Sequence, residues 1–187
     1  MLWDADDDTL LVSAGRGDQV AFNRLVQRHA PRLHAVARHY GCSKADADEI
    51  VQDTFWQAWK AAKKWQPGRA KVFTWLYRLA ANRTIDYHRV ESRRRTDSFG
   101  EDQDFEDETT NPERLLADRQ RLSAMQTAIA ELPDRQRMAI ILSAQQDKSN
   151  AEIAKILGSS EEAVEQLIMR ARRTLRDKYR TGSWNDP

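Results

Sequence analysis

Cysteine, glycine and proline are scarce in this sequence. Cys42 is the only cysteine among 187 residues, which excludes an internal disulfide and a cysteine-rich zinc site. There are seven glycines and five prolines, and most of the prolines stand where a helix is expected to begin or end. No apolar run approaches the ~20 residues that a membrane-spanning helix needs. These absences favour an all-α fold and predict no membrane span.

The N-terminus lacks the features of a secretion signal. Residues 1–8 are acidic and contain neither the basic stretch nor the apolar stretch of a signal peptide. We therefore expect a cytoplasmic protein. A Gly-rich phosphate-binding loop is absent as well, so nucleotide hydrolysis is not expected.

Few residue clusters could support catalysis or metal binding. His39 and Cys42 are three residues apart, but Tyr40-Gly41 is expected to end the helix between them, so packing is a simpler interpretation than metal binding or redox sensing. The other candidate is a group of four carboxylates: Asp46, Asp48, Glu49 and Asp53. Without partners that converge on them, these carboxylates indicate a solvated or protein-binding helix face rather than acid catalysis or Mg²⁺ binding. We predict no catalytic residue, no metal and no cofactor.

The net charge of +1 averages three segments of unlike charge. Residues 1–95 hold 17 Lys and Arg against 11 Asp and Glu, a net charge of +6. Residues 96–111 hold seven acidic residues and no basic one, and residues 112–187 hold 13 basic against 11 acidic residues, a net charge of +2. Two basic segments on either side of an acidic strip indicate a polyanionic partner.

Hydrophobic periodicity and cap residues predict helices along most of the chain. Pro31 is expected to interrupt the first of them, and Ser43 with Asp46 resembles a capping box at the start of the next. The expected helices are 18–40 with its interruption, 44–64, 71–94, 112–132, one from 134 onward, 151–157 and 161–180. The expected parts are an N-terminal tail (1–17), a helical domain (18–95), an acidic linker (96–112), a second helical domain (113–180) and a C-terminal tail (181–187).

The acidic segment between the two domains has no usable periodicity. Its self-repelling charge favours an extended or disordered linker. Fully extended, 16 residues reach roughly 53–58 Å, which is about one and a half turns of duplex DNA. Two domains tethered in this way could read separate sites on one DNA.

Residues 150–168 have the pattern of a helix-turn-helix. Ala154 is small enough for two helices to cross closely, and Gly158 permits the tight turn between them. Four apolar residues would face the shared core: Ile153, Leu157, Val164 and Ile168. The second helix would lie in the major groove, and its basic C-terminal half would contact phosphates. An ordinary helical hairpin with a solvated charged face is the alternative, but it needs no small-residue turn combined with an Arg cluster.

Residues 63–95 interleave aromatic rings with cations. Unpaired bases can stack on such rings while Lys and Arg hold the nucleic-acid backbone, so the pattern suits a single strand. The alternative is that the rings fill a small core and the charges are solvated. Trp75 together with Leu76 is expected to serve packing.

These segments, in this order, resemble the extracytoplasmic-function sigma factors, the smallest members of the main bacterial sigma family. Residues 46–59 are similar to the helix by which that family grips core RNA polymerase, residues 73–89 to its −10 promoter helix, and residues 132–175 to its −35-binding domain. The resemblance covers about residues 18–95 and 113–178. It implies sigma region 2 and region 4 domains joined by the acidic linker.

The function that this resemblance implies is promoter recognition without catalysis. The protein would bind core RNA polymerase, recognise the −35 and −10 elements of promoter DNA, and promote melting. An anti-sigma factor would regulate it.

The resemblance also assigns three sets of residues. The polymerase-binding set is Asp46, Asp48, Glu49, Gln52, Asp53 and Trp56. The set that binds the single strand of the −10 element is Lys63, Lys64, Trp65, Arg69, Lys71, Trp75, Arg78, Asn82, Arg83, Asp86 and Arg89. The −35 set is Ser160, Glu161, Glu162, Glu165, Gln166, Met169, Arg170, Arg172 and Arg173.

The recognition helix departs from the family's pattern. Where many relatives have a Lys-Ser-Arg-like stretch, this chain has Glu165-Gln166-Leu167. Glu can accept a hydrogen bond from cytosine and Gln can read adenine. Alternatively, this face binds DNA weakly or is used by a regulator, so no relative's −35 sequence is transferred.

Two other classes of protein remain as alternatives. A conventional helix-turn-helix repressor or activator would bind duplex operators as a dimer, but it would leave the 63–95 block unused. An enzyme acting on nucleic acid would need a metal or nucleophile constellation that the sequence does not offer.

Overall fold

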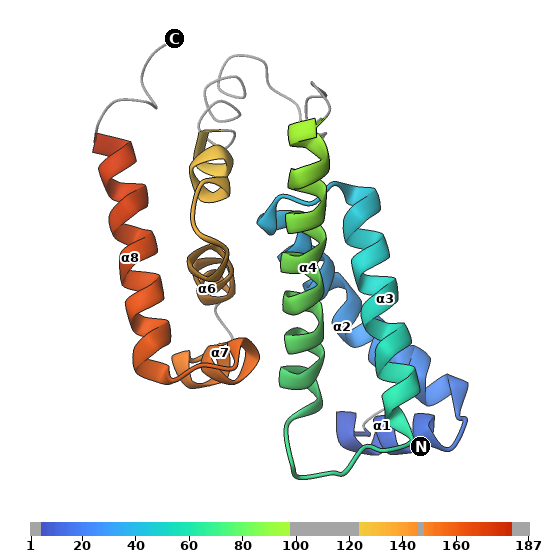
Figure 1. Cartoon of the computed structure of the whole chain (residues 1–187). Helices are drawn as coiled ribbons and strands as arrows, with labels where there is room; N and C mark the ends of the chain where they lie inside the picture. The colour runs from blue at the N-terminus through green and yellow to red at the C-terminus, as the bar shows by residue number, and fades with distance from the viewer. Residues whose placement is uncertain (1–4, 98–123, 146–147, 181–187) are drawn as a thin grey trace, which may run out of the picture.

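The computed structural model describes residues 5–97, 124–145 and 148–180. All regular secondary structure in these ranges is α-helical, which confirms the predicted fold class. Figure 1 shows α1 to α4 gathered on one side of the molecule and α6 to α8 on the other. The helices are α1 (Asp7–Gly15), α2 (Gln19–Tyr40), α3 (Lys44–Ala62), α4 (Val72–Asp97), α6 (Asp134–Ala144), α7 (Asn150–Leu157) and α8 (Glu161–Arg180), with a further helical segment at 124–130.

Capping residues fix where several helices begin and end. At α3 the Ser43 hydroxyl accepts the backbone N–H of Asp46, whose carboxylate accepts the backbone N–H of Ser43, so the predicted capping box is confirmed. Ser149 and Glu152 form the same arrangement at α7. Gly158 ends α7 with a φ of 58°, a left-handed conformation that glycine adopts without strain. These boundaries are therefore encoded locally.

Helix α2 corrects one prediction. Pro31 was expected to interrupt it, but α2 runs without a break over 22 residues with Pro31 inside. A proline within a helix costs about 3 kcal/mol. Burial of the stripe formed by Leu25, Leu33 and Val36 outweighs that cost, because each side chain contributes about 1.5–3 kcal/mol.

The N-terminal segment is part of the folded protein. Residues 1–17 were expected to be a tail, yet they contain α1, whose Leu10 and Leu11 are completely buried. Helix α1 packs against α2, α3 and α4. We therefore propose that the first domain includes α1. The predicted linker (96–112) and C-terminal tail (181–187) lie almost entirely outside the described residues.

The two helical groups pack against each other through α4 and α7 and through α2 and α6. Apolar residues from both groups form one continuous core. Arg137 of α6 is 3% exposed and lies over the Tyr40 ring at 4.3 Å, and its guanidinium lies 2.6 Å from where a Cβ atom at Gly41 would be. The Tyr40 hydroxyl donates to Asp134 at 2.9 Å. The end of α2 and the start of α6 are thereby joined by a buried polar contact.

Within the part of the chain that the structure describes, no helix is both long and apolar enough to cross a membrane. Over the same residues, no three His, Cys, Asp or Glu side chains gather as they would around a metal ion.

Candidate nucleic-acid interface

The loop between α3 and α4 carries five of the residues predicted to bind a single DNA strand. Lys63, Lys64, Arg69 and Lys71 are exposed, whereas Trp65 is partly buried. The ring of Trp65 packs on that of Trp75 with their centroids 5.0 Å apart. The structure thus places a pair of aromatic rings among exposed cations, the combination that binds unpaired bases.

Helix α4 continues this surface. Arg78, Asn82 and Asp86 are exposed and follow one another at four-residue intervals, so they share one face of the helix. Arg89 is exposed one turn further on. Trp75 is partly buried among the core residues, in agreement with its predicted packing role. The face from Arg78 to Arg89 extends the loop surface along the helix.

Three of the predicted strand-binding cations are paired with carboxylates of the protein itself. Arg83 lies 2.6 Å from Asp53 of α3. Lys71 lies 3.0 Å from Glu152 of α7, and Arg89 lies 2.9 Å from Asp134 of α6. The last two pairs join the N-terminal half to the C-terminal half.

Two of these carboxylates, those of Glu152 and Asp134, have a lowered pKa and are stabilised in their ionised form. The hydrogen bond from Lys71 holds the pKa of Glu152 below its usual value. Partial burial acts to raise the pKa of Asp134, but hydrogen bonds from Arg89 and Tyr40 lower it further than burial raises it. Because Lys71 and Arg89 are each more than half exposed, solvent screens their ion pairs, which are therefore weak and can be exchanged for phosphate contacts.

A cleft of about 470 Å³ lies where the loop and the first turns of α4 meet α7. Arg69, Lys71 and Arg78 contribute cations from one side, and Lys155 contributes another from the other side. The surface predicted to hold a DNA strand is therefore partly covered by the helix-turn-helix.

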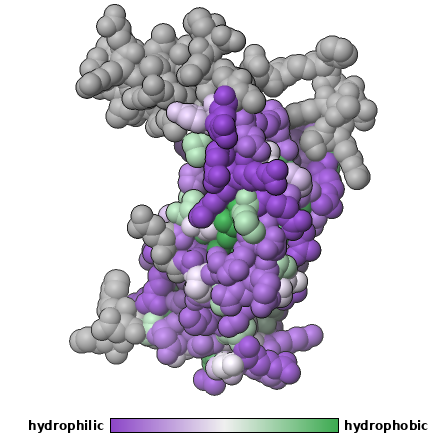
Figure 2. Space-filling view, turned by 90° about the vertical axis from the view of Figure 1, so that its left-hand side faces the viewer, coloured by the Kyte–Doolittle hydropathy of each residue, from purple (hydrophilic) through white to green (hydrophobic). Residues whose placement is uncertain are grey.

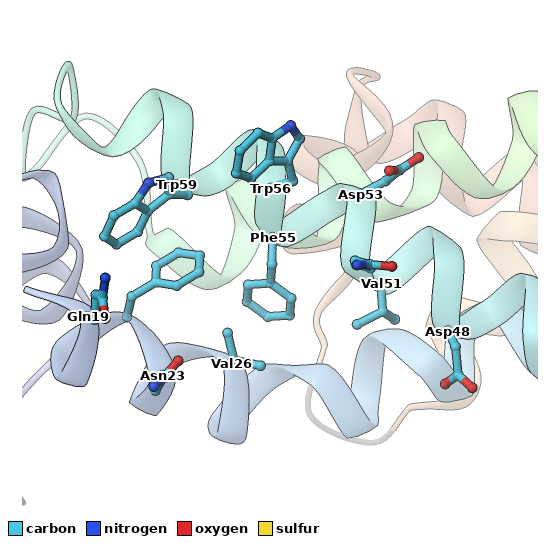
Figure 3. Close-up of a pocket in the computed structure, with 11 residues that line it drawn as sticks. Gln19, Asn23, Val26, Asp48, Val51, Asp53, Phe55, Trp56 and Trp59 are labelled. Atoms are coloured by element: carbon cyan, nitrogen blue, oxygen red, sulfur yellow. The ribbon is translucent and has the colours of Figure 1, made fainter. Parts of the chain in front are cut away.

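The predicted polymerase-binding residues divide into two groups. Asp48, Gln52, Asp53 and Trp56 line a groove of about 910 Å³ between α2 and α3, shown in Figure 3. Trp56 is 58% exposed, which is unusual for so large an apolar side chain.

Asp46 and Glu49 do not line this groove. Asp46 caps α3 and accepts a 2.6 Å hydrogen bond from the Tyr87 hydroxyl, while Glu49 lies 3.8 Å from Arg83. The pKa of Tyr87 is raised mainly by this hydrogen bond to Asp46 and, to a smaller extent, by burial.

The apolar floor of the groove was not among the predicted site residues. Phe22 and Val26 of α2 face Phe55 and Trp59 of α3, and Phe22 packs edge-on against both of those rings. The sequence places the apolar Phe22 and Val26 four residues apart, which is the spacing of an apolar stripe on a helix. It could not show that the stripe leaves an open groove, because that depends on how α2 and α3 cross.

The helix-turn-helix formed by α7 and α8 agrees with its predicted pattern. Ile153, Val164 and Ile168 are buried and Leu157 is partly buried. The Ser160 hydroxyl accepts the backbone N–H of Ala163 at the start of α8. Every residue of the predicted −35 set is exposed, from Ser160 to Arg173. Figure 2 views the molecule from the side on which α8 lies in Figure 1, and this face is mainly hydrophilic.

Two protein-family models match the chain. The first, Sigma-70 region 2, matches residues 25–94, and the second, Sigma-70 region 4, matches residues 122–175. The two matches fall on the two helical halves of the structure.

Several relatives match along nearly the whole chain. RNA polymerase sigma factor NccH of Alcaligenes xylosoxydans xylosoxydans is 37% identical over 174 residues, which cover 90% of this chain and 92% of the relative. RNA polymerase sigma factor CnrH of Cupriavidus metallidurans is 36% identical, with the same two coverages. The ECF RNA polymerase sigma-E factor of Escherichia coli is 32% identical over 92% of this chain and 93% of its own length.

Solved structures show the same fold. The structure of CnrH in complex with the cytosolic domain of CnrY has a TM-score of 0.71 at 32% identity, and the match covers 95% of this chain and 99% of that chain. The sigma factor RpoE in complex with the anti-sigma factor NepR from Bartonella quintana has a TM-score of 0.65 at 24% identity, covering 83% of this chain and 94% of that chain. The second likeness concerns the fold alone.

Proposed function

The chain belongs to the extracytoplasmic-function sigma factors, and from this premise we propose how its two helical halves share the recognition of a promoter. It binds core RNA polymerase, recognises the −35 and −10 elements of promoter DNA, and promotes DNA melting for transcription initiation. The family is one of transcription regulators, and we assign the chain no catalytic step. We expect it to act in the cytoplasm, where polymerase and chromosome meet.

The −10 strand is bound by the loop 63–71 and by α4. The observation that carries this assignment is the continuous surface of loop cations, the Trp65–Trp75 ring pair and the exposed face from Arg78 to Arg89. Stacking contributes about 1–3 kcal/mol per base, while unstacking a base costs a few kcal/mol. Melting therefore needs several captured bases together with phosphate contacts.

Core polymerase is held by the groove between α2 and α3. Its apolar floor and the exposed Trp56 provide the buried centre that a protein interface needs, and Asp48, Gln52 and Asp53 provide a polar rim. We assign Asp46 and Glu49 a supporting role in this interface, since both pair with residues of α4.

The −35 element is bound by α8. Its exposed residues from Ser160 to Arg173 face solvent along one helix, with Glu165 and Gln166 able to reach base edges and the arginines able to contact phosphates. The domains that perform these tasks are those expected at 18–95, extended by α1, and at 113–180.

An anti-sigma factor regulates the chain. The supporting observation is the likeness to CnrH, whose structure was solved in complex with the cytosolic domain of CnrY. We propose the apolar groove between α2 and α3 as the docking site for the anti-sigma factor, because the groove is open and lined by aromatic rings. Binding there would exclude polymerase.

Transcription by purified core polymerase tests this function. With the protein present, we expect transcripts from promoters selected out of a randomised −35/−10 library and none from core polymerase alone. Asn82→Ala should reduce open-complex formation roughly tenfold, whereas Gln57→Ala, an exposed amide on α3 outside the three sets, should leave it unchanged. Footprinting of duplex operator DNA without polymerase, combined with no promoter-dependent transcript, would identify a conventional repressor instead.

A further inference from the structure

Helix α1 lies outside the part of the chain that the family model covers, which begins at residue 25. It is nevertheless fixed in the N-terminal half, because Leu10, Leu11 and Ala14 are buried against α2, α3 and α4. None of the predicted site residues lies in α1, and the family match does not include this helix.

The C-terminal end of α1 touches the point where the strand-binding loop begins. A Cβ atom added to Gly15 would lie 2.5 Å from the backbone oxygen of Ala62, the last residue of α3. This is too close for any side chain, and the nearest atoms belong to backbone. Gly15 therefore allows α1 to abut the end of α3 directly before Lys63.

The N-terminal part of α1 reaches into the loop itself. The carboxylate of Asp8 accepts a 2.7 Å hydrogen bond from the indole N–H of Trp65. The Trp65 ring packs at 5.0 Å on Trp75, which lies in the first turn of α4. Asp8 thus fixes the orientation of one ring, and that ring contacts the start of the strand-binding helix.

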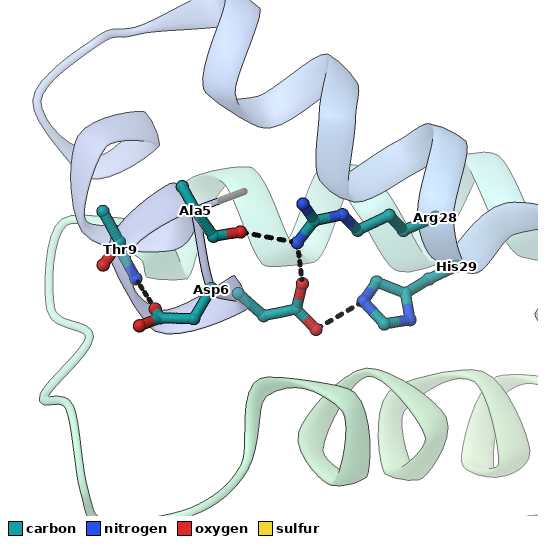
Figure 4. Close-up of polar contacts among 6 residues, drawn as sticks. Ala5, Asp6, Thr9, Arg28 and His29 are labelled. Atoms are coloured by element: carbon teal, nitrogen blue, oxygen red, sulfur yellow. Dashed lines mark hydrogen bonds and ion pairs between the residues drawn. The ribbon is translucent and has the colours of Figure 1, made fainter. Parts of the chain in front are cut away.

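Helix α1 is itself held in position by α2, as Figure 4 shows. Asp7 lies 3.0 Å from Arg28 and 2.7 Å from His29, and Arg28 also donates to the backbone oxygen of Ala5. The hydrogen bond from His29 keeps the pKa of Asp7 below its usual value although partial burial opposes this. A helix anchored at Asp7 holds the adjacent Asp8 at a defined place relative to the loop.

We propose that α1 is a positioning element for capture of the −10 strand, and that Asp8 acts through Trp65 to orient the aromatic pair toward an unpaired base. This inference rests on the strand-binding function proposed above for the loop 63–71. A single strand loses its freedom when it binds, so a loop that is already ordered lowers the cost of capture.

Variants of Asp8 in the polymerase holoenzyme test the proposal. Asp8→Ala removes the acceptor and should weaken binding of a non-template −10 oligonucleotide roughly three- to tenfold. Asp8→Asn keeps a side-chain oxygen that can accept from Trp65 and should restore most of the affinity. Asp177→Asn, which removes the same charge from an exposed site on α8, is the matched control.

Further measurements separate positioning from loss of structure. The affinity for core polymerase and the contacts to −35 duplex should stay unchanged in Asp8→Ala. In a ¹⁵N NMR spectrum of the free protein, the indole N–H signal of Trp65 should move in Asp8→Ala and much less in Asp8→Asn. In a Trp65→Phe background, which lacks the donor, Asp8→Ala should have no further effect on strand binding.

The proposal is overturned if Asp8→Ala shifts the Trp65 signal but binds the oligonucleotide as tightly as the unaltered protein, while Trp65→Ala still weakens binding. It is also overturned if Asp8→Asn is as impaired as Asp8→Ala. Should Trp65→Ala and Arg78→Ala both leave oligonucleotide binding intact, the strand-binding function of the loop and α4 fails as well.

Discussion

At the scale of single residues, Arg137 is a buried cation, and burying a charge costs free energy unless partners compensate for it. Burial lowers the pKa of its guanidinium. Among the residues that the structure describes, no carboxylate forms an ion pair with it. Its partners are the Tyr40 ring, His88 at 3.3 Å and the backbone oxygen of Ala130 at 3.5 Å. A side chain at Gly41 would collide with it. A cation over an aromatic face can contribute about 2 kcal/mol when desolvated.

Replacing this cation should therefore loosen the contact between the two halves. We expect Arg137→Ala to lower the free energy of unfolding by about 1–3 kcal/mol, measured by urea denaturation. Arg135→Ala, an exposed arginine on the same helix that donates to the Leu157 carbonyl, should cost less than about 1 kcal/mol. Equal effects of the two substitutions would show that burial of Arg137 contributes nothing specific.

At the scale of helices, α2 contains a residue that disfavours helix formation. Pro31 stands in the middle of α2 with its side chain exposed, where a proline has no packing role to offset its missing N–H. The helix persists because its opposite face is buried along its whole length, including Leu25 and Leu33.

This conflict gives a prediction of increased stability. Pro31→Ala should raise the free energy of unfolding by about 1–3 kcal/mol and leave polymerase binding unchanged, as measured by thermal denaturation and by a binding assay. Gln27→Ala, an exposed position one turn earlier in the same helix, is the control and should change stability by less than about 0.5 kcal/mol. A destabilised Pro31→Ala variant would contradict this account of α2.

At the scale of the whole molecule, the two halves lie together in a way that leaves the two proposed DNA-binding surfaces unequally accessible. The residues proposed to bind the −35 element are exposed, whereas Lys71 and Arg89 of the proposed −10 surface are paired with Glu152 and Asp134 of the C-terminal half. These carboxylates form ion pairs with the cations that we propose contact DNA phosphates. For the proposed capture of a strand by these cations, we predict that α6 and α7 move away from α4.

Removing both carboxylate charges should favour that separation. In the free protein, we expect Asp134→Asn combined with Glu152→Gln to increase the distance between the halves, measured by fluorescence energy transfer, and to strengthen binding of a −10 oligonucleotide roughly three- to tenfold. Asp177→Asn is again the control. A double variant with unchanged distance and unchanged affinity would refute the coupling.

The local part of this structure followed from the sequence. Ser43 and Asp46, Ser149 and Glu152, and Gly158 define helix ends through contacts within a few residues, so they could be identified in the one-dimensional pattern. The apolar spacing of the helix-turn-helix likewise predicted its buried face. The same spacing predicted that the residues of the proposed −35 set are exposed.

Only the tertiary structure decided how these elements meet. Helix α1 packs against α2, α3 and α4. Asp8 reaches Trp65, and Arg89 and Lys71 pair with Asp134 and Glu152, through contacts between residues 45 to 81 positions apart along the chain. Such contacts arise from the way helices cross and pack, and no spacing in the sequence records them. Most helix ends were therefore set by local contacts, whereas the continuity of α2 through Pro31 and the access to the proposed DNA-binding surface depend on tertiary packing.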